Sequence, residues 1–113
     1  MADTGNDPAA ESVRMMLYID HPLPIPLDHP TAPRCFRGRE AAHLFADSEE
    51  ELLRYALSIG MEAAWLQRSG TIWAHFDLTG RRLKRVLRDK RRVISISRGQ
   101  LAQMIRKRES LCL

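Results

Sequence analysis

The chain has few cysteines, few aromatic residues and no long apolar run. Its two cysteines, Cys35 and Cys112, have the spacing of neither a zinc knuckle nor a redox pair, and they are too few for a disulfide framework. No segment approaches the roughly 18 apolar residues that cross a bilayer. Residues 1–14 are polar where a secretory signal would be apolar. We therefore expect a soluble, cytoplasmic protein.

The remaining composition is that of an ordinary globular domain. Hydrophobic residues make up 44% and charged residues 28% of the 113 residues. A chain of this length buries about two-thirds of the surface that its unfolded form exposes, which is enough for one core. We expect a single domain over residues 15–108. A disordered extension at 1–14, which has little to bury, and a tail at 109–113 would flank it.

Charge is distributed unevenly along the chain. Residues 1–78 have 6 basic and 12 acidic residues, a net charge of −6, whereas residues 79–113 have 12 basic and 2 acidic residues, a net charge of +10. Clustered Lys and Arg attract polyanions because they release counterions from a phosphate backbone. The last third of the chain therefore favours a nucleic-acid or other polyanion partner. Two charged faces that neutralise each other, or solvated helix faces, would leave the same pattern.

Local signals predict the first elements. Apolar residues alternate along Met15–Asp20, which is typical of a strand. Residues 21–42 hold five of the six prolines, so most of this segment cannot be helix or central strand. Ser48 with Glu51 forms a capping box that opens a helix, and Gly60 is a typical helix stop.

The second half of the chain predicts two more helices. We expect a hairpin of strands 63–67 and 71–77 turning at Ser69-Gly70, and then a helix capped by Thr79. A strand at 93–96 and a helix opened by Ser97 and Gln100 follow. Strand, helix and strand in this order form a βαβ unit with parallel strands. The predicted fold class is α/β: a small mixed sheet of about four strands, covered by three helices and containing one βαβ unit.

Three polar side chains are expected at or near the carboxyl ends of strands, where ligands of open α/β sheets gather. Asp20 ends the first strand, and His75 and Asp77 lie two residues apart on another, so that both project from one face. An imidazole with carboxylates can bind a divalent metal or act as base and orienting group. Asp20 joins the other two only if the strands are neighbours. Otherwise the carboxylates cap loops, and His75 is an ordinary half-buried residue.

The beginning of the helix after Thr79 is a candidate phosphate site. Arg81 and Arg82 oppose the helix dipole there, and a bound anion would reverse that penalty. Gly80 permits close approach to the free amides of the helix start. The alternative is that Arg81 and Arg82 are only solvated surface residues, in which case no anion binds there. The residues assigned to phosphate or nucleic-acid contacts are Thr79, Gly80, Arg81, Arg82, Lys84, Arg85 and Arg88.

The aromatic residues do not favour a base-stacking protein. Trp65 and Trp73 lie in the two strands of the expected hairpin, where packing is the commoner role of tryptophan. His43 and Asp47 precede the first helix. They either extend the site of Asp20, His75 and Asp77 or flank the helix structurally, and the flanking role is the favoured interpretation.

Several sequence blocks match a known family in order. They are Leu17–Asp20, Gly38-Arg39, His43–Ser48 leading into Glu50–Leu52, Trp65, His75–Asp77 and Gln100–Ala102. In this order, Met16 to Arg106 resembles the small bacterial and phage proteins catalogued as domain of unknown function 4031. The family pattern reads Asp-His-Tyr-Asp where this chain has Ala74–Asp77, and has an arginine where Gly99 stands. The resemblance implies a shared fold and shared polar positions, including Arg39, His43 and Asp47, but supplies no reaction.

Three functions are compatible with the sequence. The first is a nucleic-acid or polyanion-binding protein that uses the basic last third of the chain. The second is a small metal-assisted hydrolase of phosphodiesterase or nuclease type, in which Asp20, His75 and Asp77 hold a divalent metal or activate water. The third is a phage or host accessory protein that binds another protein, for which the sequence has no signature.

Overall fold

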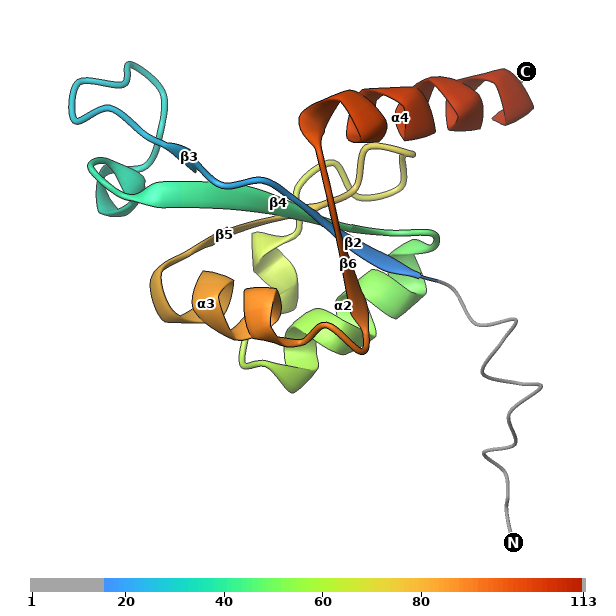
Figure 1. Ribbon diagram of the computed structural model, residues 1–113, viewed down its shortest axis with the longest axis horizontal. Coiled ribbons are helices and arrows are strands. Elements are labelled where there is room, and N and C mark those ends of the chain that lie inside the picture. Colours follow the sequence, from blue (N-terminus) through green and yellow to red (C-terminus); the bar gives the residue numbers. More distant parts are fainter. Residues whose placement is uncertain (1–15, 113) are drawn as a thin grey trace, which may run out of the picture.

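The sheet of the computed structural model is open and mixed, with helices on both faces (Figure 1). The structure describes residues 16–112, so the extension expected at 1–14 lies outside it. Its strands are β2 (Leu17–Asp20), β3 (Leu23–Pro24), β4 (Glu40–Ala46), β5 (Phe76–Thr79) and β6 (Val93–Ile96). The five strands and three α-helices of this segment confirm the predicted α/β class.

β4 is the strand on which the sheet is built. It pairs antiparallel with β2 and β3 along one edge and with β5 along the other. β6 pairs parallel with β2. The strand order explains why β5 and β6 run in the same direction without pairing: β4 and β2 lie between them. The predicted βαβ unit thus spans two intervening strands.

One face of the sheet forms the main core. Helices α2 (Glu49–Ser58) and α3 (Gly80–Arg88) lie against this face, below the sheet in Figure 1. Strand residues alternate between the faces, and a one-residue slip would turn an apolar row outward, so burial fixes the register. The largest fully buried apolar side chains of this core are Ile19, Leu44, Leu52, Phe76, Leu78 and Val86.

The other face is only partly covered, by helix α4 (Arg98–Cys112; red in Figure 1). Ser97 and Gln100 form the predicted capping box, because the side-chain oxygen of each accepts a hydrogen bond from the backbone N–H of the other. Ile105 is the buried apolar side chain that α4 contributes to its contact with the rest of the described chain. The tail expected at 109–113 is instead helical as far as Cys112. None of the helices within residues 16–112 has the length and apolarity that crossing a membrane requires.

The start of α2 is also as predicted. Ser48 Oγ accepts a hydrogen bond from the Glu51 N–H at 3.2 Å, and three glutamates occupy the first turn, where the helix dipole favours negative charge.

Two local predictions were wrong. Ala63–Trp65 forms a 3-10 turn, η2, and only the Gln67–His75 bridge remains of the expected hairpin. The strand predicted at 71–77 begins at Phe76 and runs to Thr79. The intervening residues form a wide loop in which Arg68 and Gly70 have positive φ, so the two arms do not run side by side as paired strands.

A hydrogen bond from the buried Tyr55 connects α2 to the end of α3. Its hydroxyl donates to Asp89 Oδ2 at 2.9 Å. Burial, and then this bond, raise the pKa of Tyr55 above its ordinary value of 10.0. Tyr55→Phe should lower the free energy of unfolding by about 1.5–3 kcal/mol, because the bond is to a charged acceptor. Tyr18→Phe is the matched control, because its bond to Asp47 is longer, 3.4 Å, and lies at the surface.

Urea unfolding of both variants at pH 7 and at pH 11 tests this. The raised pKa means that the contribution of Tyr55 is complete below pH 10 and shrinks as pH rises beyond it, because only the unfolded chain then loses the proton. The gap between the wild-type protein and Tyr55→Phe should therefore narrow at pH 11. Equal losses in the two variants would contradict the assignment.

Candidate metal centre

Three adjacent strands bring polar side chains together on the face of the sheet that α4 partly covers. His43, on β4, is directly opposite Asp77, on β5, in the antiparallel register. Asp20 ends β2, on the other edge of β4. His75 precedes β5 and is fixed by its bridge to Gln67. His43 is therefore the residue that connects the carboxylates of two strands that are not neighbours.

Asp20 is a fully buried carboxylate, with a relative exposure of 0%. His43 donates to it twice, from the backbone N–H at 2.7 Å and from Nδ1 at 2.8 Å, and Arg98 Nη1 lies 3.8 Å from Oδ2. Burial alone would raise the pKa of Asp20. The two hydrogen bonds from His43, and then the charges of His43 and Arg98, outweigh burial, so the pKa is below its ordinary value.

The charge on Asp20 determines the tautomer of His43. An ionised carboxylate only accepts hydrogen bonds, so the imidazole proton must be on Nδ1. Whenever the ring is neutral, Nε2 therefore carries the lone pair, and this atom lies 3.6 Å from Asp77 Oδ1.

His75 has the same arrangement with a different partner. Its Nδ1 donates to the Trp73 carbonyl at 2.7 Å, which leaves Nε2 facing Asp77 Oδ1 at 3.5 Å. Burial alone would lower the pKa of His75, but the bonds to Asp77 and to the Trp73 carbonyl raise it above its ordinary value. The proton that His75 takes up on protonation is the one on Nε2. A cation that binds the Nε2 lone pair would displace this proton.

The spacing of the three groups suits a metal ion. One ligand atom from each of His43, His75 and Asp77 can be chosen so that all lie within 4.8 Å of one another. Ligands of a tetrahedral zinc ion, at about 2.0–2.1 Å from the metal, are roughly 3.3 Å apart. The Nε2–Oδ1 separations of 3.5 and 3.6 Å are close to that value.

The two histidines open into a hollow of about 430 Å³ between the sheet and α4, which we call the sheet–α4 hollow. Within the described part of the chain, its lining includes no serine, threonine or cysteine, so a protein nucleophile of those types is absent. The lining residues are Asp20, His43, Phe45, Arg68, Trp73, His75, Arg98, Leu101, Ala102 and Ile105.

The set of ligands suggested by the sequence therefore changes. His75 and Asp77 lie together as expected, but Asp20 is bound to His43 and orients it, so that His43 takes the third position. The sequence interpretation favoured a helix-flanking role for His43, because the residue lies just before the first helix, and it predicted no strand over Glu40–Ala46. The alternation of Ala42, Leu44 and Ala46 with His43 and Phe45 was the signal for a strand.

The expected phosphate site at the start of α3 is separate from this hollow, because none of its seven residues is in the lining. Thr79 Oγ1 donates to the Glu40 carbonyl instead of capping the helix. Arg82 donates to the Gly60 carbonyl, and its guanidinium lies 5.0 Å from the centre of the Trp65 ring. Arg39 is beside Gly80, where its Nη1 would be 3.3 Å from an added Cβ.

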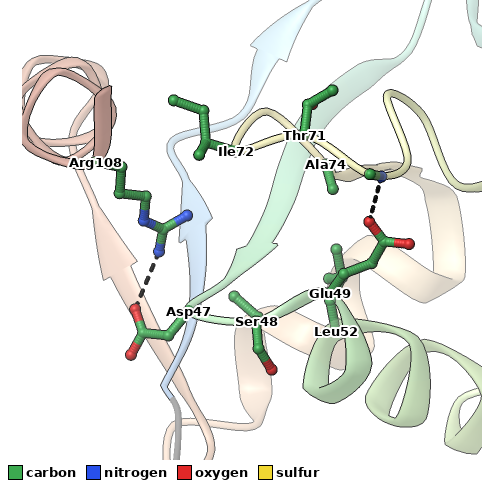
Figure 2. Close-up of a pocket in the computed structure, with 10 residues that line it drawn as sticks. Asp47, Ser48, Glu49, Leu52, Thr71, Ile72, Ala74 and Arg108 are labelled. Carbon is green, nitrogen blue, oxygen red and sulfur yellow. Dashed lines mark hydrogen bonds and ion pairs between the residues drawn. The ribbon is translucent and has the colours of Figure 1, made fainter. Parts of the chain in front are cut away.

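Asp47 lies in a second hollow of about 310 Å³ between β4, α2 and the 70–74 loop (Figure 2). It forms an ion pair with Arg108 at 3.0 Å and accepts the Met16 N–H at 2.9 Å. Glu49, across this hollow, accepts from Gly70 N–H and Ser69 Oγ. Both carboxylates are thus used in joining segments of the chain.

A family model described as "Protein of unknown function (DUF4031)" matches residues 25–108. This segment contains His43, His75 and Asp77 and begins after Asp20. No match was found among curated proteins or among solved structures.

The Asp20–His43 interaction predicts a tautomer change. Asp20→Asn should preserve the side chain's shape, but the amide NH₂ would donate to His43 Nδ1 and so move the ring proton to Nε2. Two-dimensional ¹H–¹⁵N spectra of the imidazoles should show the Nδ1–H form of His43 in the wild-type protein and the Nε2–H form in the variant. His75, which donates to a backbone carbonyl, should keep its tautomer and is the internal control. An unchanged His43 spectrum would contradict the assignment.

Proposed function

The chain belongs to the DUF4031 family, and we propose that it is a metal-assisted hydrolase of a phosphate-containing substrate, with a divalent cation held by His43, His75 and Asp77. The observation that carries the proposal is the shared orientation of the two imidazoles. In each, Nδ1 donates to an acceptor and Nε2 faces Asp77 Oδ1. Metal-binding histidines are oriented in this way by a carboxylate or a backbone carbonyl.

The donor set favours zinc. Two imidazole nitrogens and one carboxylate are the ligand types of catalytic zinc sites, which leave a fourth position for water. Bound there, the metal would supply hydroxide near neutral pH by lowering the pKa of that water to about 7. The described lining residues include no serine, threonine or cysteine nucleophile, which is consistent with attack by water. Hydrolysis would form a bond from this oxygen to phosphorus and release the ester oxygen as an alcohol.

Two arginines support an anionic substrate. Arg98 and Arg68 both line the sheet–α4 hollow. Arg98 is held by Asp20 and by the His21 carbonyl, at 3.8 and 3.4 Å. The Arg68 guanidinium has no hydrogen bond or ion pair with any described residue, so it is available to a ligand. Guanidinium groups bind phosphate oxygens strongly and stabilise charge that develops in phosphoryl transfer.

Calorimetric titration with Zn²⁺ tests the metal site. The wild-type protein should bind one ion per chain. Alanine at His43, His75 or Asp77 should weaken binding by more than the roughly 10–100-fold that loss of an outer-shell partner costs. His29→Asn is the matched control, because His29 accepts two loop N–H groups and asparagine keeps an acceptor there.

Activity separates an enzyme from a metal-binding protein. The zinc-loaded protein should hydrolyse bis(p-nitrophenyl) phosphate, whereas His43→Ala should have only background activity. Binding of zinc without hydrolysis would reject the enzymatic part of the proposal. Equal zinc affinity of the wild-type and His43→Ala proteins would reject the site itself.

A second function, polyanion binding, is supported by α3. The five basic residues of this helix, Arg81, Arg82, Lys84, Arg85 and Arg88, are all exposed, and the helix contains no acidic residue. Of these five side chains, only that of Arg82 contacts a partner within the described part of the chain, namely the Gly60 carbonyl and the Trp65 ring. The helix covers the face of the sheet opposite α4 (Figure 1), so this surface is distinct from the sheet–α4 hollow.

The salt dependence of DNA binding tests this second function. Replacing Arg85 and Arg88 by glutamine should reduce the slope of log K against log salt by about 1.8, because each phosphate contact contributes about 0.9. The control, glutamine at Arg106 and Lys107, removes the same charge from exposed positions of α4 and should leave the slope unchanged. Fluorescence anisotropy with a labelled duplex provides the measurement. No binding at low salt, or equal effects of the two variants, would reject α3 as the contact surface.

A further inference from the structure

The sheet–α4 hollow has two chemically different parts. The histidines, Arg68 and Arg98 provide the polar part described above. The rest of its lining is apolar and comes from three elements: Phe45 of β4, Trp73 of the 68–75 loop, and Leu101, Ala102 and Ile105 of α4. A metal-bound phosphate ion would occupy only the polar part, which leaves the apolar wall without a function.

Trp73 is held beside the candidate metal centre while its ring remains accessible. Its backbone N–H donates to Thr71 Oγ1 at 3.1 Å, and its carbonyl accepts from His75 Nδ1 at 2.7 Å. The side chain is nevertheless 39% exposed, which is unusual for the largest apolar residue at the edge of a hollow. The predicted pairing of strands 63–67 and 71–77 does not form around it, because Ala63–Trp65 is the 3-10 turn η2 and only the Gln67–His75 bridge remains.

Trp65 is a useful comparison, since it has the same exposed fraction of 39%. The Arg82 guanidinium already lies over its ring, and it does not line the hollow. Of the two tryptophans, Trp73 is therefore the one that lines the sheet–α4 hollow together with Arg68 and the two histidines.

We propose that the hollow binds a nucleoside phosphate, with the base against Trp73 and the phosphate beside Arg68 and the metal centre. This inference rests on the proposed hydrolase function and names the substrate class of the same site. The hollow, about 430 Å³, falls within the roughly 300–1,000 Å³ of small-molecule sites. A base stacks on an aromatic ring whatever its sequence identity.

Fluorescence of Trp73 tests the inference directly. Trp65→Phe leaves Trp73 as the only tryptophan, because the chain has two. The zinc-loaded protein is titrated with adenosine 5′-monophosphate, ribose 5-phosphate and phenyl phosphate. We expect quenching by the nucleotide and an affinity at least about 10-fold higher than for ribose 5-phosphate, since stacking of a base contributes of this order.

Paired variants identify the stacking residue. Trp73→Ala should abolish the preference for the nucleotide in a calorimetric titration while zinc affinity and ribose 5-phosphate affinity stay unchanged. Trp65→Ala should retain the preference. The nucleoside phosphate is either a free nucleotide or the 5′ end of a nucleic-acid strand, and a 5′-phosphorylated trinucleotide distinguishes the two. Tighter binding of the trinucleotide than of the mononucleotide indicates the nucleic-acid end, and weaker binding indicates the free nucleotide.

Failure of this inference is distinguishable from failure of the proposed function. If zinc binds but the nucleotide and ribose 5-phosphate have equal affinity, the hollow does not bind a base. The inference is then rejected, and the proposed metal site is retained. If phenyl phosphate binds as tightly as the nucleotide, the substrate is an aryl phosphate and the inference is overturned. If zinc does not bind, the proposed function is itself rejected.

Discussion

The site depends on one interaction, the pair of hydrogen bonds from His43 to the buried carboxylate of Asp20. An isolated carboxylate without exposure to water would be very costly, and these two bonds, with Arg98 nearby, are what make it tolerable. The same bonds join β2 to β4 beyond the last ladder pair between them. They also place the imidazole proton on Nδ1, so Nε2 is directed at Asp77. A buried charge in one strand thus determines what the neighbouring strand can bind.

The architecture leaves this face of the sheet open to ligands. α2 and α3 cover the opposite face, where the apolar rows of the strands form the core. α4 covers the other face only in part. Two arginines of this helix form ion pairs with the sheet side of the hollow: Arg98 contacts Asp20, and Arg108 contacts Asp47. The helix that completes the hollow is therefore held in part by the carboxylate that orients His43. Changes in the position of α4 and in the orientation of His43 should be coupled for this reason.

The elements that were predicted correctly are those whose signals lie in residues close together in the sequence. Capping boxes located α2 and α4, and alternation located β2; α3 begins after Thr79 as predicted, although that side chain does not cap it. β4 was missed because its alanines and its place after a proline-rich segment gave no strong strand signal, and its pairing depends on distant residues. The hairpin was wrong because Ser69-Gly70 resembles a tight turn but belongs to a wide loop. Asp20, His75 and Asp77 were recognised as a group, whereas the role of His43 required the order of the strands, which no local pattern encodes.

Anomalous diffraction from crystals soaked in zinc, recorded on both sides of the zinc absorption edge, tests the central claim most directly. The account predicts one strong peak in the sheet–α4 hollow, about 2.0–2.1 Å from Nε2 of His43 and of His75 and within bonding distance of Asp77. A peak at other residues only, such as Asp47 and Glu49 of the second hollow, would contradict it. So would coordination through Nδ1 of either histidine, because that atom is already used to orient the ring.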